Sequence, residues 1–253
     1  MFLRAAALSV ALSCTATAAL AADNNSFTLL HAGKPVGRAS YTIDTTKDGY
    51  RLRSHFEYRI PAAPADALNS DHGSSAPTEA QYSSEFKIDA DGNFLSGYTQ
   101  NAANQMITAY QPSKLRDSIT VSQNQGGVSG DGHTLPMPGP DFLVAPDYDP
   151  GTLQILLTTS LAHPHKDSKY TLLVPGNGNS PKSSNTLIYI AIHPAPNATG
   201  TFDGKPVTLK HYQVSYLKGS ADLYTDDAGR LMEADMGPLG STFVRAKFAL
   251  VIQ

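Results

Sequence analysis

Residues 49–60 read GYRLRSHFEYRI, and their apolar and charged side chains alternate with a period of two. Successive side chains of a β-strand point to opposite faces of its sheet, so the alternation predicts a strand with one buried face and one wet face. A wet face is typical of antiparallel sheets, because parallel sheets are usually covered on both sides. The stretch therefore predicts an antiparallel sheet.

The same alternation returns at residues 79–89 and resumes at 94–100. Between them, Asp89-Ala90-Asp91-Gly92-Asn93 supplies residues that tolerate a positive φ, which predicts a tight hairpin. Further strands are expected over residues 26–31, 35–44, 116–123, 170–174, 185–193, 207–217, 221–225 and 242–252. Since about a dozen strands exceed one flat sheet, we expect a mainly β fold, a single antiparallel half-barrel or barrel.

For two of these strands the sequence also predicts a position within the sheet. Residues 186–192 are apolar on both faces, so we expect them at the centre of the sheet and covered on both sides. Residues 242–252 are expected to form one strand that closes the sheet. Its inner face would carry Val244, Ala246, Phe248, Leu250 and Ile252, with Arg245 and Lys247 opposite.

Residues 150–162 break the strand rhythm and predict one packed α-helix. Asp149 suits the N-cap and Pro150 the first helical position. The stripe expected to pack on the sheet consists of Leu153, Leu156, Leu157 and Leu161. Residues 61–77 and 125–149 are rich in Pro, Gly and small polar residues and are expected to be long loops.

Residues 1–21 have the pattern of a secretory signal peptide. Arg4 precedes an uncharged run rich in Ala and Leu, and Ala19-Leu20-Ala21 is a small-x-small cleavage triplet. Residues 22–253 are then expected to be one β-rich domain, periplasmic or secreted, with no transmembrane segment, because no later stretch approaches about 20 apolar residues. The alternative is a lipoprotein signal that leaves the chain lipid-anchored through Cys14.

Cysteine and charge usage exclude several classes of site. Cys14 is the only cysteine in the chain, so the mature protein is expected to have no disulfide and no thiolate chemistry. Loss of Arg4 leaves 18 of the 19 basic residues against 22 acidic ones, a net charge of −4. Nucleic acid is not expected as a partner, because it calls for clustered Lys and Arg.

Three motifs carry a resemblance to a known family. They are Gly33-Lys34-Pro35-Val36-Gly37 followed by Tyr41, Asp149-Pro150 leading to Leu156-Leu157, and a strand, turn and strand at 221–231. Together they resemble a family of exported, uncharacterised β-rich domains from Gram-negative bacteria, related to the lipoprotein-carrier half-barrels. The chain departs from that family in having no Trp and no Arg at the end of the helix. The resemblance implies a half-barrel or barrel that holds an apolar molecule, and it implies no catalytic residues.

Candidate metal ligands are few. The segment 163–165 (HPH), with Asp167 or His193, offers imidazoles, but zinc needs three or four converging ligands, and solvated histidines explain the segment equally. Residues 89–93 resemble the start of a calcium loop, yet Gln100 stands where a Glu is required. A hairpin turn explains the same residues. No metal and no cofactor is therefore expected.

Motifs for hydrolysis are weak. The chain contains no G-x-S-x-G, and residues 237–241 form a turn before a strand. Carboxylates for a glycosidase could come from Glu79, Glu85, Asp222 and Glu233, but nothing singles out a pair. The glycine-rich residues 126–132 lack the Lys and helix of a phosphate loop. A hydrolase site assembled from distant His, Asp and Ser residues remains the alternative function.

Surplus aromatic residues on strands favour binding instead. The candidates for an apolar ligand cavity are Tyr41, Phe56, Tyr58, Tyr82, Phe86, Tyr98, Tyr212 and Tyr216. The same residues are equally suited to a core. We expect an exported, non-enzymatic binding or envelope protein for a lipid or lipoprotein. A dry cavity lined by these aromatics favours that function, a His bonded to Ser and Asp in a cleft favours the hydrolase, and a self-filled concave face favours a structural module.

Overall fold

The computed structural model describes residues 25–60, 78–102, 105–115, 117–129, 132–137, 142–144, 149–162, 169–174, 186–216, 219–237 and 240–251. These residues form seventeen strands and one helix. The strands are β1 (Asn25–His31), β2 (Lys34–Thr46), β3 (Gly49–Ile60), β4 (Thr78–Asp89), β5 (Phe94–Asn101), β6 (Met106–Pro112), β7 (Ser118–Gln125), β8 (Val128–Ser129), β9 (His133–Pro136), β10 (Phe142–Val144), β11 (Lys169–Val174), β12 (Thr186–Phe202), β13 (Lys205–Tyr216), β14 (Gly219–Thr225), β15 (Leu231–Asp235), β16 (Ser241–Arg245) and β17 (Phe248–Val251). The helix is α1 (Pro150–Ala162).

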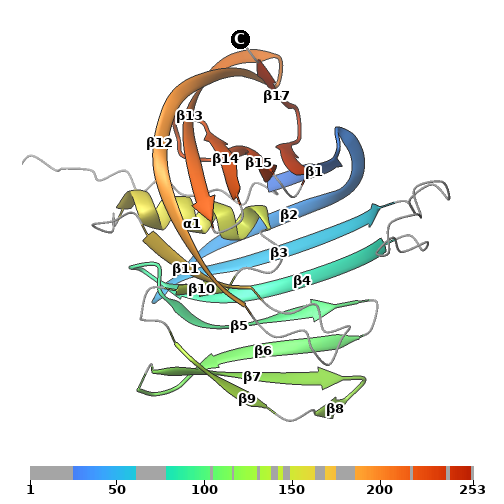
Figure 1. Ribbon diagram of the computed structural model, residues 1–253, viewed down its shortest axis with the longest axis vertical. Helices are drawn as coiled ribbons and strands as arrows, with labels where there is room; N and C mark the ends of the chain where they lie inside the picture. The colour runs from blue at the N-terminus through green and yellow to red at the C-terminus, as the bar shows by residue number, and fades with distance from the viewer. Residues whose placement is uncertain are drawn as a thin grey trace, which may run out of the picture.

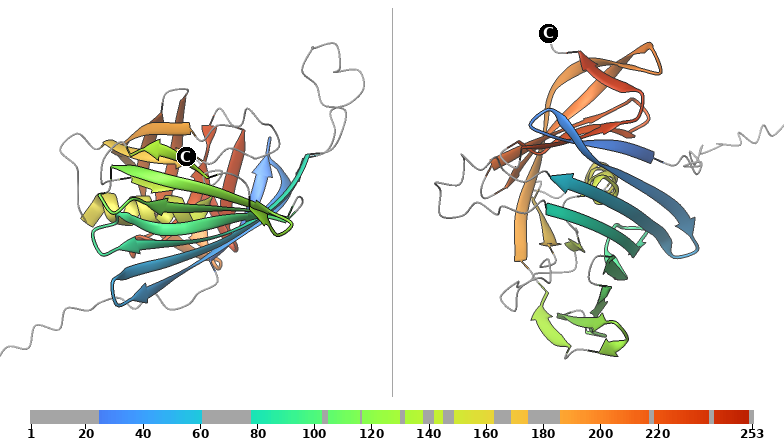
Figure 2. Two further views of the ribbon diagram at one scale, coloured as in Figure 1. Left: turned by 90° about the horizontal axis from the view of Figure 1, so that it is seen from below. Right: turned by 90° about the vertical axis from the view of Figure 1, so that its right-hand side faces the viewer.

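The strands form one strongly curved sheet that is not closed into a barrel (Figures 1 and 2). Its order is β9-β7-β6-β5-β4-β3-β2-β1-β16-β15-β14-β13-β12-β11-β10, with β8 also pairing with β7. β17 pairs with the second half of β12. The described pairs are antiparallel apart from β10 and β11, which run parallel. The predicted mainly antiparallel fold with one helix is confirmed, in its half-barrel form.

The stretch 49–60 is β3, in the middle of the N-terminal half of the sheet. It pairs with β4 along its whole length. Leu52 and Phe56 are buried, whereas Arg53 and Arg59 between and beyond them are exposed. The alternation therefore sets which face of the sheet turns towards the interior.

α1 lies across the concave side of the sheet, between its N-terminal and C-terminal halves (Figures 1 and 2). Asp149 is the N-cap, because its Oδ1 accepts hydrogen bonds from the backbone N–H groups of Gly151 at 2.8 Å and Thr152 at 3.2 Å. Residues 150–157 are all buried. Leu161, predicted to pack on the sheet, is instead 52 % exposed, although the neighbouring Ser160 is buried.

The first turn of α1 packs closely against β2 and β3. A Cβ atom added to Gly151 would lie 2.7 Å from both Leu52 Cδ1 and Ser54 Oγ and 2.9 Å from Tyr41 Cβ. Ordinary carbon contacts are about 3.5–4.0 Å. The glycine therefore allows the helix to approach the sheet at this point.

The prediction of one continuous last strand is wrong. This stretch contains the two strands β16 and β17, because Lys247 adopts a φ of 65° and the chain reverses after β16. Arg245, expected on the wet face, is buried. β17 then pairs with β12 and does not close the sheet. Leu209, Met232 and Phe248 form a small second core under this turn.

The structure also differs from the sequence predictions at β12 and in the region 106–149. Tyr189 is 65 % exposed while Ile190 is buried, so β12 is covered on one face only there, not on both. The predicted loop 125–149 contains the short strands β8, β9 and β10, and β6 was not predicted. Residues 1–21 and 61–77 lie outside the described residues. Within the part of the chain that the structure describes, no helix has the length and apolar character needed to span a bilayer.

Candidate functional site

The aromatic residues predicted to line a cavity lie mostly in the main core. Tyr41, Phe56, Phe86 and Tyr212 are buried members of that core. Three others, Tyr58, Tyr82 and Tyr216, are partly buried and pack against it. Tyr98 is 40 % exposed on the convex face. That these residues contact a ligand stays a prediction.

Beneath the first turns of α1, the described side chains leave almost no empty space. The void there measures about 10 Å³. Its lining consists of Leu52, Phe86, Ile88, Phe94, Val144, Thr152 and Ile155. Since a void of this size holds at most about one water molecule, an acyl chain has no room in it. At this place the concave face is self-filled, which is the outcome that favours a structural module.

A groove of about 460 Å³ opens at one end of strands β2 to β5. It is lined by Val36, Gly37, Glu57, Tyr58, Arg59, Glu79, Gln81 and Ala102. These residues come from the start of β2, the end of β3, the start of β4 and the residue after β5, on the right-hand side of Figure 1. The volume falls within the range of about 300–1,000 Å³ found for small-molecule sites.

The apolar part of the groove is built around Tyr58. Its ring lies 5.2 Å from the ring of Phe56, centroid to centroid, and packs against the main core. Gly37 is the register partner of Tyr58, and a Cβ atom at that position would lie 2.8 Å from Tyr58 Cβ. The same Cβ atom would lie 2.1 Å from the Glu57 carbonyl oxygen, so the glycine allows β2 and β3 to approach closely at this point. Val36 and Ala102 complete the apolar lining.

The charged part of the groove consists of side chains held in ion pairs. Arg38 Nε donates to Glu57 Oε1 at 3.0 Å. Arg59 Nε lies 2.8 Å from Glu79 Oε1. Paired charges beside an apolar wall suit a ligand that has both an apolar part and a polar head.

A Ser–His–acid row stands next to the groove. His55 Nδ1 lies 3.2 Å from Ser83 Oγ, and its Nε2 lies 3.9 Å from Glu57 Oε2. This is the grouping that the hydrolase alternative requires, with Glu in place of Asp. However, the row lies on the exposed convex face. Ser83 is paired in register with both β3 and β5, so the surrounding ladders leave no backbone N–H pair for an oxyanion hole.

Among the described residues, the other groups predicted to bind a metal do not converge. The segment 163–165 and Asp167 lie outside the described residues. Asp89 Oδ1 accepts from the backbone N–H groups of Asp91 and Asn93 at 3.0 and 2.7 Å, so its carboxylate serves the hairpin turn. Among the residues that the structure describes, no group of three or more His, Cys, Asp and Glu side chains is arranged to hold a metal ion.

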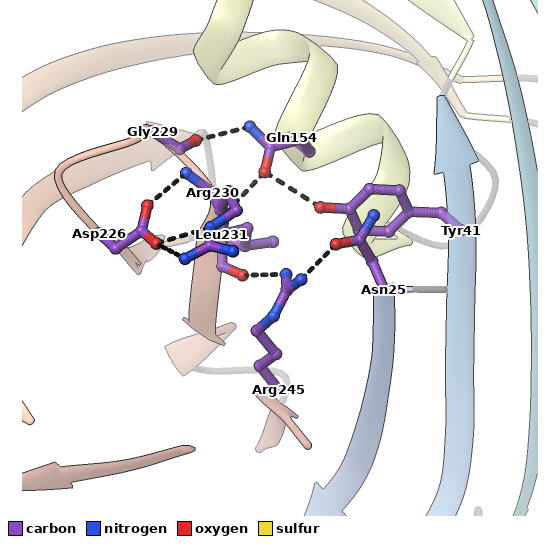
Figure 3. A network of polar contacts seen from close by, with 8 residues as sticks. All are labelled: Asn25, Tyr41, Gln154, Asp226, Gly229, Arg230, Leu231 and Arg245. Atoms are coloured by element: carbon purple, nitrogen blue, oxygen red, sulfur yellow. Dashed lines mark hydrogen bonds and ion pairs between the residues drawn. The ribbon is translucent and has the colours of Figure 1, made fainter. Parts of the chain in front are cut away.

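A buried polar network joins α1 to both halves of the sheet (Figure 3). Gln154 Oε1 accepts from Tyr41 Oη at 3.0 Å and from the backbone N–H of Leu231 at 2.6 Å. Gln154 Nε2 donates to the Gly229 carbonyl at 2.8 Å. One helical side chain therefore satisfies backbone groups of the β14–β15 hairpin and a hydroxyl of β2.

Arg245 extends the same network (Figure 3). Its Nη1 donates to the Leu231 carbonyl at 3.1 Å, its Nη2 donates to Asn25 Oδ1, and its guanidinium lies 5.8 Å from the Phe27 ring centroid. Burial raises the pKa of the Tyr41 hydroxyl, and the nearby Arg245 charge partly opposes that rise. The side chain ties β16 to β15 and β1.

A second polar group lies on β13, β14 and β15. His211 Nε2 is 2.8 Å from Asp222 Oδ1, and the His211 ring stacks on Tyr224 with centroids 4.5 Å apart. Glu233 is the register partner of Tyr224 on β15. Burial, and then the charge of Asp235, raise the pKa of Glu233 to about 7.

Of the groove residues, Tyr58 was predicted to line a ligand cavity and Glu79 was a candidate glycosidase carboxylate, whereas the others were not predicted as site residues. Val36, Gly37, Gln81 and Ala102 carry no chemical signal, and they meet only through the pairing of four strands. Gln154 was likewise indistinguishable from any polar residue in a helix. No protein-family model matches the chain, and no curated protein sequence or solved structure is significantly similar to it.

Proposed function

We propose that the protein is an exported, non-enzymatic binding protein that holds an amphiphilic ligand, a lipid or the lipid part of a lipoprotein, in the groove at the ends of β2 to β5. The groove carries the proposal, because an apolar wall around Tyr58 lies beside the ion-paired Glu57, Arg59 and Glu79. The signal-peptide pattern of residues 1–21 supports export, and the resemblance to lipoprotein-carrier half-barrels supports the ligand class.

The first test uses the absence of Trp from the chain. A Tyr58→Trp variant has a single indole in the groove, and we expect its emission to shift to shorter wavelength when a single-chain phospholipid is added below its micelle concentration. Tyr189→Trp is the matched control, since Tyr189 is exposed on β12 and does not line the groove. Equal shifts in the two variants would show unspecific adsorption and contradict the proposal.

Native mass spectrometry of residues 22–253, purified from a bacterial periplasm, is the second test. We expect an adduct that organic extraction removes and identifies as a lipid. Replacement of Tyr58 by Asp should abolish the adduct, because a charge would then face the apolar wall. A bare protein mass that stays unchanged after incubation with envelope lipids would overturn the proposed function.

A further inference from the structure

The outward face of β5, β6 and β7 carries no charge. These strands read FLSGYTQN, MITAYQP and SITVSQNQ, without Asp, Glu, Lys, Arg or His. Inward residues such as Tyr110 and Val121 are buried, whereas Tyr98 and Ile107 are exposed. The convex face of the neighbouring β3 and β4 is instead crossed by Arg–Glu ion pairs. The charged surface therefore ends at β4.

The outward side chains of the three strands form rows, because residues in register lie side by side. Tyr98 is in register with Ala109, which is in register with Ser122. The next row runs from Gln100 through Ile107 to Asn124. We call the surface made by Tyr98, Gln100, Ile107, Gln111, Ser122 and Asn124 the uncharged face.

Several polar groups of the uncharged face are available to a ligand. The side chains of Tyr98, Gln100 and Gln111 are exposed, so their hydroxyl and amide groups face solvent. An amide donates and accepts hydrogen bonds, as does a sugar hydroxyl. An aromatic ring offers an apolar surface with a polar tip, which suits the face of a sugar ring.

Size and charge limit what can dock there. Strands about 4.8 Å apart with a rise of about 3.4 Å per residue give this face a footprint of only a few hundred Å². A stable protein interface needs about 800 Å² on each partner. A short run of sugar rings fits the smaller area, and a neutral one suits strands that carry no charged residue.

We propose that the uncharged face binds a neutral polysaccharide, with the Tyr98 ring stacked on one sugar and the Gln100 and Gln111 amides bonded to its hydroxyls. This site goes beyond the proposed function, since it lies on the convex face and needs none of the groove's apolar wall.

Affinity electrophoresis tests the site directly. The mature protein runs through native gels that contain dextran, laminarin or hydroxyethylcellulose, or the anionic polysaccharide alginate. We expect retardation by at least one neutral polysaccharide and none by alginate. Tyr98→Ala should weaken that binding about tenfold, Tyr98→Phe should keep most of it, and the double change Gln100→Ala, Gln111→Ala should also weaken it.

Tyr189→Ala is the control, because Tyr189 is an exposed tyrosine on β12 and should leave the mobility unchanged. Circular dichroism melting checks that each variant is folded. The proposal is overturned if no neutral polysaccharide retards the protein, if Tyr98→Ala binds as well as the wild type, or if alginate retards it equally. It is also overturned if ultracentrifugation shows a dimer that Tyr98→Ala dissociates, because the face would then be a protein interface.

Discussion

Gln154 shows how much a single buried amide contributes to this fold. Its side chain bonds the backbone of the β14–β15 hairpin and the hydroxyl of Tyr41 (Figure 3). Gln154→Met keeps the approximate shape but leaves these buried partners unsatisfied. We expect the free energy of unfolding to fall by about 3 kcal/mol or more, since each unsatisfied group costs about 1–3 kcal/mol.

Urea unfolding followed by circular dichroism measures that loss. Tyr41→Phe is the comparison, because it removes the hydroxyl that bonds Gln154 and leaves Leu231 paired with Gln154, so the expected loss is about 1 kcal/mol. A Gln154→Met variant no less stable than Tyr41→Phe would show that the network does not hold the hairpin.

Glu233 gives the protein a predicted pH dependence of stability. Its pKa rises from 4.5 to about 7 on folding, chiefly through burial. Between these two values the folded state holds a proton that the unfolded chain has released, so stability falls as the pH rises through this window. Glu233→Gln should remove this contribution to the decrease in the free energy of unfolding with rising pH. Asp91→Asn, in an exposed turn, should keep it when both variants are unfolded in urea from pH 4.5 to 7.5.

At the scale of elements, the position of α1 depends on Gly151. Gly151→Ala would normally strengthen a helix by up to about 1 kcal/mol, but here the added Cβ meets Leu52, Ser54 and Tyr41. We expect a net destabilisation of about 1–3 kcal/mol, the usual result of overpacking. Leu161→Ala, at an exposed position of the same helix, should stay within about 0.5 kcal/mol. Thermal melting distinguishes the two, and a stabilised Gly151→Ala would mean that α1 can move off the sheet.

The same helix shows which elements are predictable from the sequence. Its start follows from Asp149 and Pro150, which are local signals, just as the β4–β5 turn follows from residues 89–93. The reversal between β16 and β17 was missed because Lys247, not a Gly or Asn, takes the positive φ. The groove could not be predicted, since its lining depends on strand pairing, which one sequence does not reveal.

At the scale of the whole molecule, the half-barrel consists of two runs of neighbouring strands. β1 to β9 form the N-terminal run and β10 to β17 the C-terminal run (Figure 1). They are joined by the ladder between β1 and β16, from Phe27–Arg245 to His31–Ser241. α1 and the Gln154 network cross the same boundary on the concave side.

The ladder between β1 and β16 forms late in the synthesis of the chain. β1 is the first strand that the structure describes, yet one of its two partners, β16, ends at residue 245. The ladder therefore cannot form until residue 245 has left the ribosome. Until then β1 has an open edge, which invites pairing with the wrong chain. Contacts of such long sequence separation also make folding slow. A newly made chain should therefore depend on a chaperone for a longer time than a β protein in which every strand pairs with the next one in the sequence.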